Sequence, residues 1–288
     1  MAAADLASSV IDTSVAHPAR RYNYWLGGKD NFAADRASAD AIERIFPGIR
    51  TAAIENRRFL HRAVRHLVEQ EVVRQFLDVG TGLPTRDNTH EVAQRLDPTA
   101  RVVYVDNDPI VLVHARALLT SHPAGATAYL EADLRTPQDI LTAPELTGTL
   151  DLTQPVAVLL VAVLHFLPDH HQAYTAVRTL MAAMPGGSFL VISHATTDLL
   201  PADTARRLTA PDVPGRGEFT PRSSEQIARF FDGLSLTDPG VQVISAWRPD
   251  PSRSQPPPDQ VAAYGAVARK PARRRPGHAP AGPGTASR

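Results

Sequence analysis

The chain contains 288 residues, of which 43% are hydrophobic and 21% are charged, and thirty basic residues balance thirty acidic ones. This composition is typical of a globular protein with one large domain, and the balanced charge argues against a nucleic-acid partner. The absence of cysteine excludes disulfides, thiolate catalysis and zinc sites built on cysteine.

The sequence also indicates where the protein resides. The N-terminus carries Asp5 where a signal peptide has positive charge, and it lacks an apolar segment of the required length. The longest apolar run, 156–164, is nine residues long, whereas a membrane span needs about 20. We therefore expect a cytoplasmic protein without a membrane partner.

The first quarter of the chain has a helical pattern. Residues 1–16 show no pattern and are predicted to be disordered. Apolar residues at helical spacing predict helices over 35–46 and 51–70, separated by the helix-breaking Pro47-Gly48. Residues 17–71 are therefore predicted to form a helical cap, or lid.

The rest of the chain alternates between strand and helix patterns. This alternation predicts a Rossmann-like α/β domain over 72–270, with a mostly parallel sheet of seven strands and helices on both faces. The basic, proline-rich segment 271–288 is predicted to be a disordered tail. The predicted strands cover 72–79, 101–105, 126–131, 156–163, 188–194, 241–246 and 263–269, and the predicted helices cover 88–96, 110–119, 170–184, 202–209 and 223–231.

The first of these strands runs into a glycine-rich turn, Asp78-Val79-Gly80-Thr81-Gly82. Two glycines allow the backbone to turn sharply and to approach a ligand closely. A dinucleotide fingerprint requires a third glycine at residue 85, which is Thr85. The charge of Asp78 repels phosphate and suits a cationic group, so this turn is expected to contact a positively charged ligand.

Acidic residues also follow the next two strands. Asp106 lies 24 residues after Gly82, close to the spacing of roughly 20 expected for an acid that binds ribose hydroxyls. Asp133 could accept a hydrogen bond from an adenine amino group, with Leu134 packed on the ring. Because parallel strands end at one edge of the sheet, these residues are expected to form a single nucleoside site. Two further expected contacts are Asn107, next to the ribose acid, and Leu164, in the segment 164–169 after the fourth strand.

Together these residues resemble the class I S-adenosylmethionine-dependent methyltransferases. A closer resemblance, to the actinobacterial S-adenosyl methyltransferase family (a former domain of unknown function), rests on the strings at 19–36, 76–94 and 104–116, with 247–249 and 264–270. The resemblance covers most of 17–270. It implies S-adenosylmethionine as cofactor and a late antiparallel hairpin, but it implies no particular substrate.

A polar and aromatic cluster surrounds Gly27-Gly28 near the N-terminus. One interpretation is a loop that packs on the sheet with its hydrogen bonds satisfied. The other is a lid that covers the methyl donor and excludes water. The expected lid or substrate contacts are Tyr22, Asn23, Lys29 and Asn31.

Histidines follow the fourth predicted strand. His165 is a candidate general base, although a polar residue lining the pocket is an equally simple interpretation. The spacing of His165, Asp169, His170 and His171 matches no zinc motif. We therefore expect no metal, and His170 and His171 are expected to begin a solvated helix.

These observations favour a methyltransferase that acts by direct in-line transfer to a small-molecule acceptor. The cofactor already activates the methyl group, so the protein mainly binds and aligns, and no catalytic nucleophile is needed. One alternative is a regulatory module that binds S-adenosylmethionine without transferring the methyl group. Another is an NAD-dependent oxidoreductase, which the missing third glycine disfavours.

Overall fold

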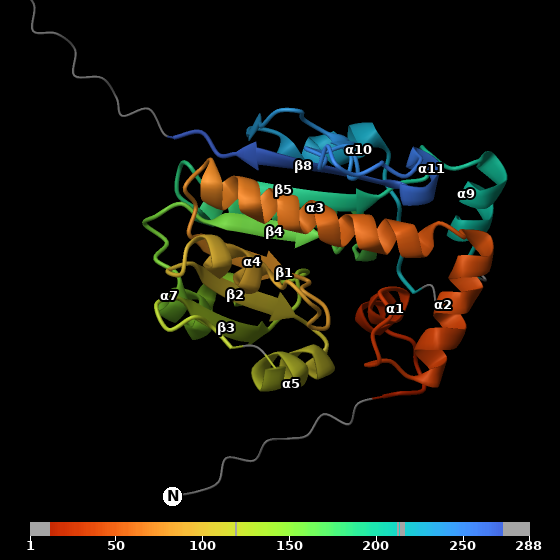
Figure 1. Ribbon diagram of the computed structural model, residues 1–288, viewed down its shortest axis with the longest axis horizontal. Coiled ribbons are helices and arrows are strands. Elements are labelled where there is room, and N and C mark those ends of the chain that lie inside the picture. The colour runs from red at the N-terminus through yellow and green to blue at the C-terminus, as the bar shows by residue number, and fades with distance from the viewer. Residues whose placement is uncertain (1–11, 119, 212, 214–216, 273–288) are drawn as a thin grey trace, which may run out of the picture.

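The computed structural model describes residues 12–118, 120–211, 213 and 217–272. They form one central β-sheet with helices on both faces (Figure 1). The parallel strands are β1 (Gln75–Val79), β2 (Arg101–Asp106), β3 (Ala126–Glu131), β4 (Ala157–Val161) and β5 (Phe189–Ala195).

The sheet is completed by antiparallel strands near the C-terminus. β8 (Ala263–Arg269) pairs along the whole of β5. Two short strands, β6 (Ser235–Leu236) and β7 (Gln242–Val243), pair with opposite ends of β8. The strand order is therefore β3-β2-β1-β4-β5-β8-β6, with β7 beside β8.

The predicted fold class is confirmed: the sheet core is parallel, the C-terminal strands are antiparallel and the N-terminal region is helical. The strand count is eight rather than seven because a two-residue strand, β6, was not expected. The first strand begins at Gln75 rather than at residue 72, because Val72 has a φ of 57° and cannot continue an extended chain. The late strand expected over 241–246 shrinks to β7, which turns at once toward the buried Trp247.

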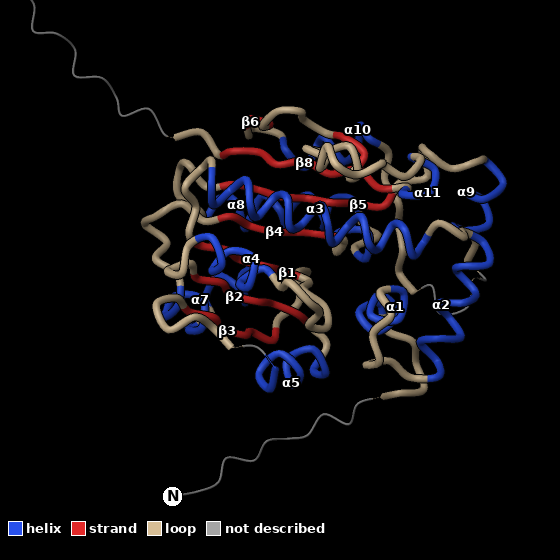
Figure 2. The backbone as a smooth tube through the Cα atoms, viewed as in Figure 1, coloured by secondary structure: helices blue, strands red, loops and turns tan. Residues whose placement is uncertain are grey.

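Helices cover the two faces of the sheet (Figure 2). On one face lie α3 (Ile49–Glu69) and α4 (Thr89–Leu96), packed on alternate strand residues such as Phe76. The neighbouring residue Leu77 points to the opposite face, as the two-residue period of a strand requires. The helices of that opposite face are α6 (Pro137–Thr142), α7 (Pro144–Thr149), α8 (His170–Ala183) and α10 (Ser224–Ala228), with the short 3₁₀ turn Arg229–Phe231.

The remaining helices gather near the carboxyl ends of the parallel strands (Figure 1). They are α1 (Pro18–Trp25), α2 (Ala33–Ile45), α5 (Pro109–Leu118), α9 (Ala202–Thr209) and α11 (Pro258–Val261). Helix α3 begins among them and then runs back along the sheet. Between β1 and β4 the strand order reverses, which is where open α/β sheets bind their ligands.

Within the described ranges, no helix combines the length and the apolar character that crossing a membrane requires.

Candidate functional site

A cavity of about 470 Å³ lies at the carboxyl ends of the parallel strands, within the usual size range of small-molecule sites. Residues from α1, α2 and α3 form one wall, and the strand ends form the other. Of the residues predicted for the site, those lining the cavity are Tyr22, Asp78, Gly80, Thr81, Gly82, Asp106, Asn107, Asp133, Leu134 and His165.

The glycine turn after β1 has the backbone that its sequence predicts. Gly80 and Gly82 have φ values of 74° and 68°, in the left-handed region that favours glycine. A Cβ atom on Gly80 would lie 2.3 Å from Cγ2 of Val163, so this position also demands the close approach of two segments. The turn therefore exposes backbone to the cavity at a point where side chains are excluded.

Asp106 stabilises this turn from the end of β2. Its Oδ2 atom accepts a hydrogen bond from the amide of Gly82 at 2.8 Å, and its Oδ1 atom accepts one from the amide of Asp108 at 3.0 Å. Burial raises the pKa of Asp106 to about 6, while the two amides oppose that shift. The carboxylate is thus held in one orientation at the cavity wall and is ionised at neutral pH.

Asp78 is the second buried carboxylate. Its Oδ2 atom accepts a hydrogen bond from Oγ1 of Thr89 at 2.6 Å. Burial raises its pKa to about 6, and the nearby charge of Asp106 adds to the shift. Two ionised carboxylates on one cavity wall favour a cationic ligand, because a bound cation lowers the electrostatic free energy of the two buried negative charges.

The end of β3 contributes a polar pair and an apolar side chain. Nδ2 of Asn107 donates to Oδ2 of Asp133 at 3.0 Å, which ties the ends of β2 and β3 together. Arg135 donates to the same carboxylate through its amide and its guanidinium, at 2.8 and 3.1 Å. Leu134 is buried and lines the cavity beside them. A planar base could pack on Leu134 there and be recognised at its polar edge.

His165 lies after β4, in the 3₁₀ turn Leu164–Phe166. Its Nδ1 atom accepts a hydrogen bond from the amide of Ala195 at 3.4 Å, which assigns the proton of the neutral ring to Nε2. Burial, followed by the charges of Arg222 and Arg21, lowers the pKa of His165 to about 3. At neutral pH the ring is therefore a hydrogen-bond donor toward the cavity and a poor proton acceptor.

Arg222 fixes the segment that carries His165. Its guanidinium donates to the carbonyl oxygens of Leu164 and Leu167 at 2.9 and 2.7 Å and contacts Nε2 of His194 at 2.9 Å. Its Nε atom donates to Nδ1 of His170 at 3.2 Å. His194 and His170 are thus partners of a buried cation. In the described part of the chain, no group of three or more metal-ligand side chains comes together.

A directional hydrogen-bond chain crosses the cavity wall. Oγ of Ser193 donates to Oδ1 of Asn56 at 2.5 Å, and Nδ2 of Asn56 donates to the hydroxyl of Tyr22 at 2.9 Å. The hydroxyl of Tyr22 donates in turn to the carbonyl oxygen of Ala53 at 3.0 Å. The chain joins β5 to α3 and α1, and it leaves Tyr22 facing the cavity with its hydroxyl engaged.

Several predicted residues lie away from the cavity. Oδ1 of Asn23 accepts from the amide of Asp30 and from Nδ2 of Asn31, at 3.1 and 3.0 Å, so both asparagines shape the turn after α1. Lys29 is exposed on that turn. Leu164 is buried in the core and does not line the cavity, and its carbonyl oxygen accepts a hydrogen bond from Arg222.

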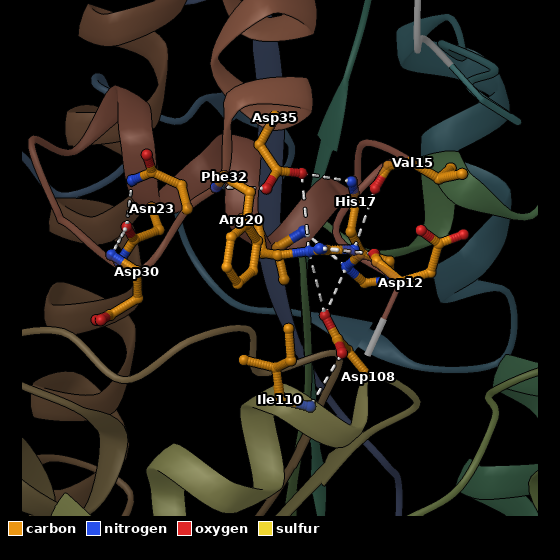
Figure 3. Close-up of polar contacts among 12 residues, drawn as sticks. Asp12, Val15, His17, Arg20, Asn23, Asp30, Phe32, Asp35, Asp108 and Ile110 are labelled. Carbon is orange, nitrogen blue, oxygen red and sulfur yellow. Dashed lines mark hydrogen bonds and ion pairs between the residues drawn. The ribbon is translucent and has the colours of Figure 1, made fainter. Parts of the chain in front are cut away.

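The turn after α1 and the adjoining helices carry a buried ion-pair cluster that joins them to the sheet (Figure 3). Arg20 lies between Asp35 and Asp108, with Nε–Oδ distances of 3.7 and 3.8 Å. The backbone amide of His17 donates to Asp35 at 2.8 Å, and Nδ1 of His17 lies 3.1 Å from Oδ2 of Asp108. That nitrogen also lies 3.4 Å from the amide of Ala19. Because Nδ1 accepts the hydrogen bond from Ala19, the neutral ring carries its proton on Nε2, and Oδ2 of Asp108 is left without a hydrogen-bond donor among the described residues.

The sequence analysis missed several residues that line the cavity. Trp25, Phe219 and Leu208 supply apolar surface, and Arg21 and Arg57 supply charge. All five lie on N-terminal helices, on α9 or in the segment before α10, and their role depends on long-range packing. The fourth strand ends two residues earlier than the predicted residue 163, because Ala162 has a φ of 58°, and Ala162 lines the cavity directly after β4.

The site therefore combines a glycine turn, a buried acid after β2 and a polar–apolar pair after β3, all at the switch point of a Rossmann-like sheet. These features fit a positively charged nucleoside ligand and define the class of S-adenosylmethionine-dependent methyltransferases. The chain belongs to the S-adenosyl methyltransferase family, whose sequence profile matches residues 4–271. The cofactor of this family is S-adenosylmethionine.

Two solved structures are similar over nearly the whole chain. A DUF574 family protein from Streptomyces avermitilis MA-4680 is 45% identical, with a TM-score of 0.83, and the match covers 91% of this chain and 100% of that one. A Thermobifida fusca YX protein described as a proposed methyltransferase is 40% identical, with a TM-score of 0.81 and coverage of 93% and 100%. A search of curated proteins gave no match.

Proposed function

We propose that the protein transfers a methyl group from S-adenosylmethionine to a small-molecule acceptor inside the cavity. The observation that carries this proposal is the continuity of the cavity across the switch point. It runs from the acidic strand ends of β1, β2 and β3 to the ends of β4 and β5 without a wall between them. A nucleoside over the first three strands would leave space for an acceptor over the others.

The residues of the first region supply the contacts that the cofactor needs. Asp106 would accept hydrogen bonds from the ribose hydroxyls while it keeps its bond to the amide of Gly82. Leu134 would pack against the adenine, with Asp133 at its amino edge. The buried carboxylate of Asp78 would balance the positive charge of the cofactor. Because these groups are already fixed by hydrogen bonds, binding costs little reorganisation.

When bound, S-adenosylmethionine supplies a methyl group on a positively charged sulfur, which an acceptor atom takes by in-line displacement. The protein contributes alignment of the acceptor and exclusion of water. His165 supports this role as a neutral hydrogen-bond donor, because its pKa of about 3 makes it a poor base. The mechanism accordingly needs no nucleophile from the protein.

The N-terminal helices act as the lid of this site. Tyr22, Trp25 and Arg21 of α1 line the cavity directly, whereas Asn23 and Asn31 shape the turn that follows. The ion pair of Arg20 with Asp108, and the contact of the His17 ring with the same carboxylate, hold α1 against the end of β2. Closure of α1 would exclude water from the reacting groups.

The acceptor space distinguishes a transferase from a regulatory module that only binds the cofactor. Such a module would need the glycine turn and the acids, but it would have no use for a second space beside them. The apolar residues contributed by α1, α2, α3 and α9 build that second space here. The presence of this second space favours a methyltransferase over a module that only binds the cofactor.

The test is calorimetric titration with S-adenosylmethionine, S-adenosylhomocysteine and NADH. The first two should bind and NADH should not. Asp106→Asn should weaken both by about tenfold or more, because hydrogen bonds to a charged group contribute about 1.5–3 kcal/mol. Asp139→Asn, on the exposed side of α6, makes the same charge change outside the cavity and should leave the affinities unchanged. Absence of binding by a folded wild-type protein would refute the proposal.

A further inference from the structure

The carboxylates that line the cavity lie on one side of it, accompanied there by the cations Arg57 and Arg135. Three of the acidic residues that line it, Asp78, Asp106 and Asp133, lie at the ends of β1, β2 and just after β3. The fourth, Glu218, forms an ion pair with Arg135, which also binds Asp133, so it lies on the same side. Among the described residues, the lining contributed from the ends of β4, β5 and β8 therefore carries no carboxylate.

Positive charge and a hydrogen-bond donor face this second region. Arg21 of α1 is only 3% exposed and lines the cavity. His165 lines the same cavity, and the charge of Arg21 contributes to lowering the pKa of His165. Nε2 of His165 carries the ring proton, since Nδ1 accepts from Ala195. Arg222 adds a buried positive charge behind the ring.

Apolar and aromatic side chains form the rest of this region. The rings of Phe166 and Phe219 pack against His165, with centroid distances of 4.4 and 5.4 Å. Trp25, Phe46 and Leu208 close the far side. Such walls favour a ligand with a large apolar or aromatic body. The donor His165 and the cations Arg21 and Arg222 would then lie at one end of that ligand.

From this arrangement, and resting on the function proposed above, we propose that the methyl acceptor is an aromatic small molecule that presents an acidic hydroxyl as an oxyanion to Arg21 and His165. The acidic hydroxyl loses its proton to solvent on binding. The oxyanion then uses a lone pair to form the O–CH₃ bond as the S–CH₃ bond breaks, and the bonding pair stays on sulfur. The products are the O-methylated acceptor and S-adenosylhomocysteine.

The arrangement explains how the reaction proceeds without a base. A cation and an N–H donor stabilise an oxyanion relative to the neutral hydroxyl, so the acceptor ionises more readily in the cavity than in water. An amine acceptor would bind as a cation beside Arg21 and Arg222 and would be repelled. The two halves of the cavity thus suit a cationic donor and an anionic acceptor.

The test measures binding of three naphthalene probes to protein saturated with S-adenosylhomocysteine: 2-naphthoate as the anion, 2-naphthalenemethanol as the neutral form and 2-naphthylmethylamine as the cation. Trp25 is one of two tryptophans and lines the cavity, so its fluorescence reports occupancy. Naphthoate should bind about tenfold or more tightly than the amine, as expected for charge-assisted hydrogen bonds. Equal or tighter binding of the amine, or binding of no probe, would overturn the inference.

Variants separate the acceptor region from the cofactor region. Arg21→Met should reduce naphthoate affinity by about tenfold and leave S-adenosylhomocysteine binding intact. Arg178→Met, an exposed residue of α8, is the control for the charge change. His165→Gln keeps an N–H donor and should retain more affinity than His165→Phe. Unchanged naphthoate binding in Arg21→Met would contradict the inference.

Leu208→Trp provides a second test that does not depend on the folding of the arginine variant. The larger side chain should fill the apolar region, so all three probes should lose affinity while S-adenosylhomocysteine still binds. Probe binding that survives this change would place the probes elsewhere and overturn the inference. Failure of S-adenosylhomocysteine to bind the wild-type protein would instead refute the proposed function, so the two failures are distinguishable.

Discussion

Nδ1 of His17 lies 3.1 Å from Oδ2 of Asp108, across the boundary between the N-terminal helices and the sheet. The backbone amide of Asp108 donates to Asp106, the proposed ribose acid. One residue therefore binds the lid through its side chain and the cofactor acid through its main chain. Closure of the proposed lid would therefore be linked to the orientation of the acid at this position.

Asp108→Asn should weaken this link without disturbing the fold. The amide side chain can still accept from the amide of Ile110, as Asp108 does now, but the charge that faces His17 and Arg20 is lost. We expect S-adenosylhomocysteine affinity to fall by about tenfold, equivalent to about 1.4 kcal/mol. Calorimetry gives the affinity, and hydrogen exchange of the α1 amides should become faster.

Asp30→Asn is the matched control for that change. Asp30 also connects the N-terminal segment to α5, through His114 at 3.5 Å, but both side chains are partly exposed. Exposed ion pairs contribute little, so affinity and exchange should stay at wild-type values. Equal effects of the two substitutions would contradict a specific role for Asp108.

The buried carboxylates predict how cofactor binding depends on pH. The folded-state pKa values of Asp78 and Asp106 are both about 6, above their ordinary value of 3.8. A cationic ligand requires the ionised forms, so affinity should fall as pH drops below 6, by about tenfold per pH unit for each carboxylate required. Calorimetric titration with S-adenosylmethionine between pH 5 and 8 checks this.

In the ligand-free protein, the stabilising contribution of Asp78 and Asp106 should depend on pH in the opposite direction. A raised pKa means that the folded state binds the proton more tightly than the unfolded chain, so protonation stabilises the fold. Their contribution to the free energy of unfolding should therefore decrease as pH rises from about 4 to 6. The melting-temperature increase caused by S-adenosylmethionine should grow over the same range. A ligand-induced shift independent of pH would refute this assignment, and Asp106→Asn should reduce the dependence.

Gly80→Ala should abolish the geometry of the cofactor turn. A residue with a Cβ atom costs about 1–2 kcal/mol in the left-handed region, and here the added atom also collides with Val163. We expect cofactor binding to be lost in a destabilised protein. Gly148→Ala in α7 meets no atom within 4 Å, and it should be neutral or slightly stabilising. Cofactor affinity in Gly80→Ala equal to that of Gly148→Ala would show that the turn does not bind the ligand.

Arg222→Met should destabilise the protein strongly. The substitution removes a buried guanidinium and leaves the carbonyl oxygens of Leu164 and Leu167 without their donor. Loss of one partner from a buried charged network costs about 3–5 kcal/mol. Urea denaturation measures the change. The exposed substitution Arg178→Met should alter stability by no more than about 0.5 kcal/mol, and an equally small effect for Arg222 would refute its anchoring role.

Local sequence patterns predicted the fold well because each parallel strand is a continuous apolar segment ended by a turn signal. The strand over Ala126–Glu131 and the helix over Ala202–Thr209 have the predicted bounds. Antiparallel strands of two residues, such as β6, carry too few side chains to produce a pattern. Of the predicted disordered segments, residues 1–11 and 273–288 lie outside the described residues. Residues 12–16 are described, and the carbonyl oxygens of Asp12 and Val15 accept hydrogen bonds from Arg20. The cap boundary at residue 71 stays a prediction.

The two regions of the cavity differed in how far the sequence could predict them. Asp78 and Asp106 lie at the carboxyl ends of β1 and β2, so their position depends only on where those strands end. Arg21 and Leu208 reach the cavity because helices distant in sequence pack together, and no local signal marks that contact. Lys29 and Asn31 were predicted as lid or substrate contacts, yet the structure places them on the turn after α1 and outside the cavity.

The 21-residue helix α3 belongs to both halves of the molecule. Ile49, Ala53 and Asn56 of its first turns line the cavity, whereas Leu67 near its end is buried against the sheet. A hinge that swings the whole N-terminal region away would have to break this helix or strip it from the core. If the proposed lid opens, α1 and α2 would therefore move relative to α3, which stays packed on the sheet.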